Sequence, residues 1–112
     1  MTMNKKLVLA ILGSPHRNGT TAAMMDIATR RAEEKGYMVT KINLYEKNIL
    51  FCIGCRNCMG TQICTQKDDM QKIVALLHDC QIVFLAAPVY WANVPAPVKN
   101  LFDRLLGTAM EV

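Results

Sequence analysis

The most constraining feature of this sequence is an apolar run that stops at a loop of small and polar residues. Residues 6–12 are apolar almost throughout and do not alternate, which is typical of a parallel strand buried on both faces. The loop from Gly13 to Thr21 follows, and a helical pattern begins where it ends. A strand that passes directly into a helix predicts the first unit of a doubly wound α/β sheet.

Three segments carry helical periodicity. The first has an apolar stripe over residues 22–32 and ends at Gly36, a residue suited to a helix C-terminus. The second begins at Asp68, with Gln71 in the capping-box position. The third covers residues 95–107.

Two further segments are predicted strands. Residues 37–44 alternate and are more polar than the first strand, which favours a place at the edge of the sheet. Residues 81–87 are apolar, which predicts another buried strand. With right-handed crossovers, we expect a three-layer α/β/α sandwich whose parallel strands have the order 2-1-3.

Composition narrows the classes of function. The 112 residues carry a net charge of +4 without a basic cluster, so nucleic acid is a poor candidate for a partner. No apolar run approaches the roughly 20 residues that cross a bilayer, and the short run before Gly13 is not expected to be a signal peptide. We expect a cytoplasmic protein that contacts no membrane, whose five cysteines serve metal or redox chemistry.

The loop after the first strand offers groups that bind a phosphate monoester. Backbone N–H groups from Arg17 to Thr21 can converge on an anion at the positive end of the helix. It is neither a P-loop nor a Gly-x-Gly-x-x-Gly fingerprint, and an ordinary strand–helix connection with good N-caps is the alternative. The candidate side chains are the hydroxyls and amide of Ser14, Asn18, Thr20 and Thr21, with positive charge from His16 and Arg17.

The loop after the third predicted strand, residues 88–95, is expected beside the first one. In sheets of this order, ligands bind beyond the carboxyl ends of the strands, where the strand order switches. Tyr90 and Trp91, with Asn93 and the backbone amides, suit a flat heteroaromatic ring. The alternative is that both aromatic residues pack against the following helix.

Three segments together resemble a known family: Gly13-Ser14-Pro15-His16-Arg17-Asn18-Gly19-Thr20-Thr21, Pro88-Val89-Tyr90-Trp91 and Lys99…Phe102-Asp103-Arg104. The chain resembles the flavodoxin-like NAD(P)H-dependent FMN reductases, and within them the iron–sulfur flavoproteins. The resemblance implies that FMN phosphate is bound by Ser14, His16, Asn18, Gly19, Thr20 and Thr21, and that Pro88, Val89, Tyr90, Trp91 and Asn93 border the isoalloxazine ring. Asp103 and Arg104 are expected to be structural.

The resemblance also implies hydride transfer from NAD(P)H to FMN and then to a small-molecule or protein electron acceptor. No residue is singled out as a catalytic acid or base. Two alternatives stay open: a flavodoxin-type electron carrier, and a thiol or metal redox module that no longer binds flavin.

Four cysteines form a second candidate site, with the spacing C-x2-C-x2-C-x5-C: Cys52, Cys55, Cys58 and Cys64. The spacing is close to a bacterial iron–sulfur run, with a longer last gap and no following proline. Zinc and a metal-free, redox-active thiol loop are the alternatives. The resemblance to iron–sulfur flavoproteins implies a [4Fe–4S] cluster on these four residues.

The number of strands sets a further expectation. A flavodoxin-like domain has five parallel strands, whereas residues 1–112 supply three. We therefore expect a single domain that corresponds to the N-terminal part of the full family domain. Residues 81–87 would then form an open sheet edge, which favours pairing with another chain, so at least a dimer is predicted.

Overall fold

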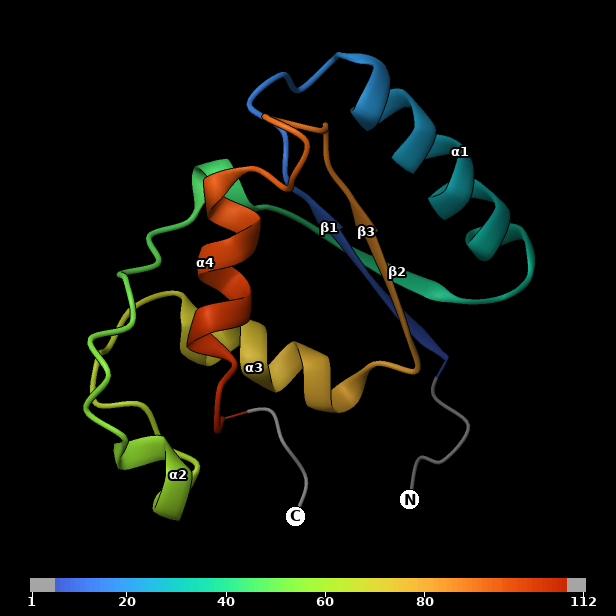
Figure 1. Ribbon diagram of the computed structural model, residues 1–112. Coiled ribbons are helices and arrows are strands. Elements are labelled where there is room, and N and C mark those ends of the chain that lie inside the picture. The colour runs from blue at the N-terminus through green and yellow to red at the C-terminus, as the bar shows by residue number, and fades with distance from the viewer. Residues whose placement is uncertain (1–5, 109–112) are drawn as a thin grey trace.

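The computed structural model describes residues 6–108, and its sheet contains three parallel strands (Figure 1). The strands are β1 (Leu7–Leu12), β2 (Met38–Asn43) and β3 (Ile82–Ala86). Their order is β2-β1-β3, which confirms the predicted order 2-1-3. Leu12 at the end of β1 lies opposite Asn43 on one side and Ala86 on the other. The carboxyl ends of all three strands therefore meet at one edge of the sheet.

Helices cover both faces of this sheet. α1 (Thr20–Glu34) lies on one side, and α3 (Met70–Asp79) and α4 (Ala96–Arg104) lie on the other (Figure 1). β1 is buried from Leu7 to Ile11, as its unbroken apolar run predicts. β3 is only partly buried, so the prediction of another buried strand over residues 81–87 is wrong; within the described residues, β3 has a neighbouring strand on one side only. The core between the sheet and the second helix layer consists of Leu9, Ile11, Ile42, Leu44, Met70, Ile73, Val98 and Leu101.

α1 packs through a narrower stripe than its apolar residues suggest. Its buried residues are Ala22, Met25, Thr29 and Ala32. Met24 and Ile27 are exposed, because a sheet of three strands is covered by one line of side chains along the helix. Gly36 has a φ of +94°, so the left-handed conformation predicted at this helix end is present.

α3 begins with the predicted capping box. The Asp68 carboxylate accepts the Met70 N–H at 2.9 Å, and the Gln71 side chain accepts the Asp68 N–H at 2.8 Å. The segment before it, expected to be irregular, contains two short helices, η1 (Leu44–Glu46) and α2 (Asn57–Thr61). None of the helices within residues 6–108 has the length and apolar character needed to span a membrane.

α4 ends at Arg104, before the predicted stop at Gly107. The reason for a glycine at position 107 is close packing. An added Cβ would lie 2.7 Å from the carbonyl oxygen of Cys58 and 3.0 Å from its sulfur. Because Gly107 has no side chain, the segment after α4 can pack against Cys58 in the cysteine-containing loop, residues 52–64.

Candidate functional site

The loops after the three strands meet at the carboxyl edge of the sheet (Figure 1). The Gly13 N–H donates to the carbonyl oxygen of Ala86 at 2.8 Å, so the loops after β1 and β3 start side by side. The Asn43 amide, at the end of β2, donates to the Ser14 carbonyl oxygen at 3.1 Å. These contacts bring together the two loops that the sequence predicts to share a ligand.

The loop after β1 leaves the N-terminus of α1 open. Gly19 is the N-cap residue, and its own N–H donates to the His16 carbonyl oxygen at 3.3 Å. No side chain caps the first turn, so the N–H groups of Thr20, Thr21 and Ala22 have no acceptor within the described residues. Ser14 is buried, and its hydroxyl oxygen accepts the His16 N–H at 3.2 Å. A serine hydroxyl that accepts one hydrogen bond can still donate its proton to a ligand. This arrangement suits an anion such as a phosphate.

The charged side chains of this loop lie outside its centre. Arg17 pairs with Glu46 at 2.7 Å, and the two side chains are 75% and 43% exposed. The exposed residues of the loop include His16, Asn18 and Thr20, while Thr21 is half-buried. The groups that the fold concentrates here are therefore backbone N–H groups and hydroxyls, with Arg17 held towards η1.

The loop after β3 forms a tight turn that displays an indole. Tyr90 and Asn93 exchange two backbone hydrogen bonds of 2.9 and 3.0 Å. Trp91 and Ala92, between them, have φ values of 52° and 57°, a left-handed conformation that disfavours residues with side chains. The Trp91 side chain is 98% exposed, so it does not pack against α4. Residues in strained backbone conformations are common in loops that bind ligands.

Tyr45 belongs to the same edge, although the sequence interpretation did not include it. It lies in η1, directly after β2. Burial raises the pKa of the Tyr45 hydroxyl, and the neighbouring Tyr90 raises it further. Its side chain lines a groove of about 320 Å³ together with Phe51 and Pro97. Its position after a strand of the predicted sheet is the signal that could have identified it.

The four predicted metal ligands surround one small cavity. Cys52, Cys55, Cys58 and Cys64 all line a space of about 30 Å³. Within the described residues, however, no three side chains of ligating type are close enough to hold a metal ion. A hydrogen bond with Thr65, 3.5 Å from the sulfur, lowers the pKa of the Cys55 thiol. The fold thus gathers the four thiols without closing them into a coordination shell.

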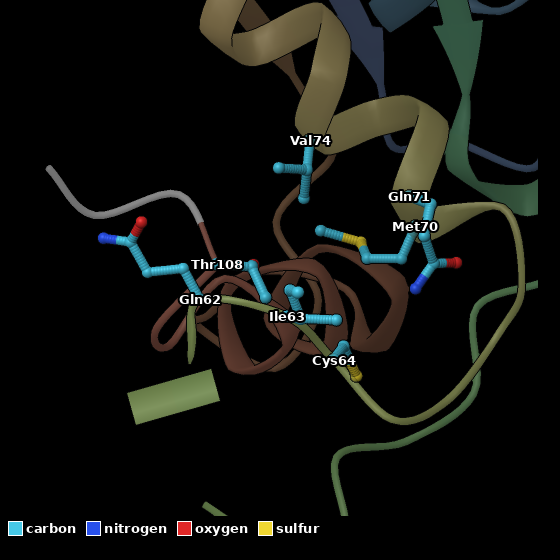
Figure 2. A pocket seen from close by; sticks show the side chains of 7 residues that line it. All are labelled: Gln62, Ile63, Cys64, Met70, Gln71, Val74 and Thr108. Carbon is cyan, nitrogen blue, oxygen red and sulfur yellow. The ribbon is translucent and has the colours of Figure 1, made fainter. Parts of the chain in front are cut away.

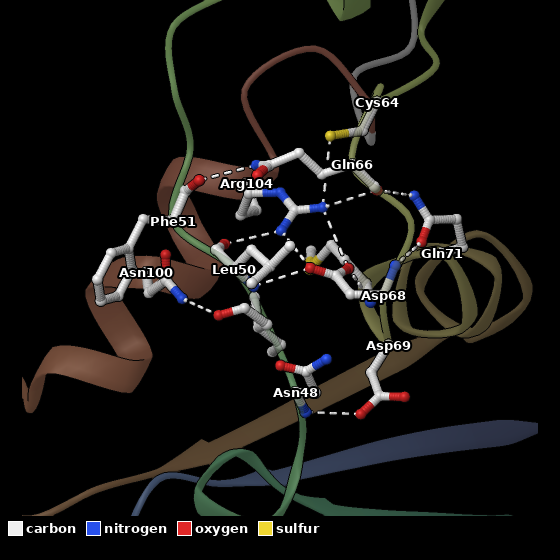
Figure 3. Close-up of polar contacts among 12 residues, drawn as sticks. Asn48, Leu50, Phe51, Cys64, Gln66, Asp68, Asp69, Gln71, Asn100 and Arg104 are labelled. Carbon is white, nitrogen blue, oxygen red and sulfur yellow. Dashed lines mark hydrogen bonds and ion pairs between the residues drawn. The ribbon is translucent and has the colours of Figure 1, made fainter.

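A buried ion pair lies beside this cavity (Figure 3). Arg104 and Asp68 are joined at 2.7 Å, and their side chains are 1% and 0% exposed. Burial alone would raise the pKa of Asp68, but hydrogen bonds from Arg104 and from the N–H groups of Leu50 and Met70 lower it overall. For Arg104, burial would lower the pKa, but Asp68 raises it overall. Both pKa shifts favour the charged form of the group.

A second cavity, of about 140 Å³, is also lined by Cys64 (Figure 2). Side chains from the cysteine-containing loop and from α3 face each other across it. The residues around it are Gln62, Ile63, Cys64, Met70, Gln71, Val74 and Thr108. None of the residues proposed to contact a flavin lines it, so it is separate from the edge where the three loops meet.

Known proteins resemble this chain over most of its length. Residues 7–111 match the family described as NADPH-dependent FMN reductase. An iron-sulfur flavoprotein of Archaeoglobus fulgidus is 39% identical over 98 residues, which cover 88% of this chain and 44% of that protein. An iron-sulfur flavoprotein of Methanocaldococcus jannaschii is 33% identical over 97 residues, which cover 87% of this chain and 50% of that protein. The chain spans about half the length of the curated relatives it matches.

A solved structure shares the fold. The NAD(P)H:quinone oxidoreductase from Methanothermobacter marburgensis superposes with a TM-score of 0.75 at 16% identity, over 94% of this chain and 55% of that chain. At this identity the likeness shows the fold alone. The α/β/α layers and the β2-β1-β3 order are therefore flavodoxin-like, which confirms the fold predicted from the sequence.

Proposed function

We propose, because the chain belongs to the NADPH-dependent FMN reductase family, that it forms the FMN-binding part of a flavin-dependent oxidoreductase. FMN, when bound there, would supply a hydride acceptor for a nicotinamide and an electron donor for an acceptor. The observation that carries this proposal is the uncapped N-terminus of α1 beside the exposed aromatic turn at Trp91. The first feature suits a phosphate and the second suits a ring.

The residues of the loop after β1 would bind the phosphate. The first-turn N–H groups of α1, which no side chain caps, would supply donors and the positive end of the helix dipole. The Ser14 hydroxyl adds a donor that is already oriented by His16. His16, Arg17, Asn18, Thr20 and Thr21 complete the proposed set, although Arg17 would have to leave Glu46 to contribute its charge.

The residues of the loop after β3 would border the ring. We assign this role to Pro88, Val89, Tyr90, Trp91 and Asn93, and add Tyr45 from the loop after β2. Tyr90 and Asn93 hold the turn through their backbone, which leaves the phenol of Tyr90 and the indole of Trp91 for contact with a ligand. The Asn93 side-chain oxygen accepts the Val94 N–H at 2.8 Å, so its NH2 group is the part that would contact a ligand. No side chain here is assigned as a general acid or base, because a flavin reaction depends mainly on orientation of the donor.

Replacing Thr20 with glutamate tests the phosphate site. A carboxylate in the first turn favours helix α1 by about 0.3–1 kcal/mol, because it complements the dipole, yet it repels a phosphate. T20E should therefore retain its stability and lose affinity for FMN in a fluorescence titration. Riboflavin, which lacks the phosphate, should bind both proteins equally. Ala23→Glu, one turn later and also exposed, is the control with the same charge. Equal FMN affinity of T20E and A23E would contradict the proposal.

Anaerobic reduction distinguishes the proposed reductase from the two alternatives. Addition of NADPH to the FMN-loaded protein should bleach the flavin absorbance. A protein that holds FMN but is not bleached by NADH or NADPH would be an electron carrier of flavodoxin type. A protein that cannot be loaded with FMN would favour a thiol or metal redox module. The proposed acceptor is a small molecule or a protein.

We also propose that Cys52, Cys55, Cys58 and Cys64 hold a [4Fe–4S] cluster, which would supply single-electron transfer. Four thiols around one cavity match the ligand set of such a cluster, and zinc is the second candidate. Anaerobic reconstitution with Fe²⁺ and sulfide, with Zn²⁺ as the parallel sample, tests the choice. We expect a broad visible absorbance, with four iron and four sulfide per chain. Zinc bound in place of iron and sulfide would contradict it.

Self-association and a cytoplasmic location complete the proposal. Within the described residues, β3 has a strand partner on one side only. Val83 and Leu85 on this strand are 44% and 42% exposed. An apolar open edge of this kind favours pairing with another chain, and we propose at least a dimer. Reduced thiols are typical of the cytoplasm.

A further inference from the structure

The cysteine-containing loop is closed by a neck in which two stretches of chain lie side by side (Figure 3). We define the neck as residues 48–51 and 64–69. Asp69 accepts the Asn48 N–H at 2.6 Å, and Asp68 accepts the Leu50 N–H at 2.8 Å. The Gln66 side chain donates to the Phe51 carbonyl oxygen at 2.7 Å. Cys52, Cys55 and Cys58 lie between the two stretches and Cys64 begins the second, so the position of all four depends on the neck.

Arg104, the last residue of α4, donates hydrogen bonds to both stretches of the neck. One terminal nitrogen donates to the Leu50 carbonyl oxygen and to Asp68, both at 2.7 Å. The other donates to Asp68 at 3.2 Å and to the Gln66 carbonyl oxygen at 3.4 Å. A planar guanidinium can serve both stretches at once, whereas a lysine ammonium is a single point charge.

The same guanidinium contacts a predicted metal ligand. Its second terminal nitrogen lies 3.3 Å from the sulfur of Cys64. Hydrogen bonds to ligand sulfurs withdraw negative charge and favour the reduced state of a metal–sulfur centre. Stability alone does not require this group, because buried ion pairs can often be replaced by apolar residues without loss. Its Nε also stays unpaired within the described residues, although it is buried.

We propose that Arg104 is a positioning residue for the cysteine loop: it fixes both stretches of the neck and, through Cys64, raises the reduction potential of the centre held by the four thiols. This inference rests on the proposed cluster for its second half. The first half concerns the chain alone and holds with or without metal.

Hydrogen exchange of the metal-free protein tests the first half. Arg104→Lys keeps the positive charge, but one ammonium group cannot donate to all the acceptors of the guanidinium, which are Leu50, Cys64, Gln66 and Asp68. We expect exchange in residues 48–69 to accelerate roughly tenfold, as for the loss of a hydrogen bond to a charged group, while α1 exchanges as in the wild type. Unchanged exchange in the neck would overturn the positioning role.

The midpoint potential tests the second half, after reconstitution with Fe²⁺ and sulfide. We expect a lower potential in R104K. Asp68→Asn is the matched control: it also breaks the ion pair, but it keeps the N–H on Cys64 and removes a negative charge, so its potential should stay or rise. A potential in R104K that equals or exceeds the wild-type value would overturn the inference, as would an equal fall in D68N.

An R104K variant that does not fold, or a wild-type chain that takes up no iron, requires a second comparison. If R104K does not fold, the pair D68N and D68N/R104Q replaces it, since removal of both charges leaves no unpaired buried ion. Lower potential and faster neck exchange in the double variant than in D68N support the inference, and equal values overturn it. A wild-type chain that takes up no iron refutes the proposed cluster together with the potential effect, while the exchange experiment still decides the positioning role.

Discussion

Gly13→Ala tests whether close packing at the end of β1 positions the loop that carries Ser14. A Cβ at this position would lie 2.6 Å from the Cγ2 of Val98 and 3.3 Å from the Cβ of Ala87. Carbon atoms in contact normally stay about 3.5–4.0 Å apart. Val98 is fully buried and β-branched, so it cannot rotate away freely. The backbone at the end of β1 or that of α4 must therefore shift to separate residue 13 from Val98.

The expected loss of stability is about 2–3 kcal/mol, near the upper end of the range for an overpacked core. Val98→Ala alone should cost about 2 kcal/mol, from two lost methyl groups and the cavity they leave. Because V98A also removes the atom that G13A strikes, the double variant should lose about 2 kcal/mol in total rather than the sum. The coupling free energy between the two positions is then about 2–3 kcal/mol.

Urea unfolding followed by far-UV circular dichroism measures these values. Fluorescence is less suitable, because Trp91 is already exposed in the folded protein. Gly60→Ala is the control: nothing lies within 4 Å of an added Cβ there, and the residue is in helix α2. That variant should be neutral or gain up to about 1 kcal/mol. Losses in G13A and V98A that add within about 0.5 kcal/mol would refute the steric argument.

Three further predictions concern other parts of the chain. Asp68→Asn should destabilise the protein by about 3 kcal/mol, because it leaves Arg104 buried without its partner. The pKa of Asp68 in the folded protein lies below its usual value. The Asp68 carboxylate therefore contributes its full stabilisation above about pH 4, and this stabilisation is lost as the pH falls through the folded pKa. Urea unfolding at pH 7 and pH 3 should accordingly show a smaller destabilisation by D68N at the lower pH. Trp91→Gly should raise stability by up to about 1 kcal/mol, because it relieves a left-handed residue, and should weaken FMN binding; a less stable variant would contradict this. The wild type should sediment as a dimer or larger species and Val83→Lys as a smaller one, and a wild type that stays monomeric at all concentrations would exclude the interface.

Much of the fold can be predicted because its signals are local. The unbroken apolar run from Leu7 to Ile11 indicates burial on both faces, and one residue pair, Asp68 and Gln71, marks the start of α3. Gly36 marks the end of α1 through its positive φ. Each of these depends on neighbours within a few positions, so sequence reasoning reaches them.

Other features depend on contacts between distant positions. Arg104 looks like an ordinary helix arginine in the sequence, and its structural role was expected, but its burial depends on Asp68, 36 positions earlier. Tyr45 and Tyr90 become neighbours only in the fold, because one follows β2 and the other follows β3. The spacing of the four cysteines predicts thiols that can converge on one centre, and in the structure the four residues line one cavity. The contacts of Cys55 with Thr65 and of Cys64 with Arg104 involve residues outside this spacing, so the cysteine pattern alone does not predict them.

Helix α4 begins at the aromatic turn and ends at the cysteine loop. Its nine residues, Ala96 to Arg104, rise about 13 Å at 1.5 Å per residue. Each residue also turns the helix by about 100°, so one inserted alanine would swing the guanidinium of Arg104 away from Cys64 as well as lengthen the helix. The length of the helix therefore fixes both a distance and a direction. The number of residues between the two loops sets both the separation of the proposed ring and sulfur sites and the direction from which the arginine meets the sulfur.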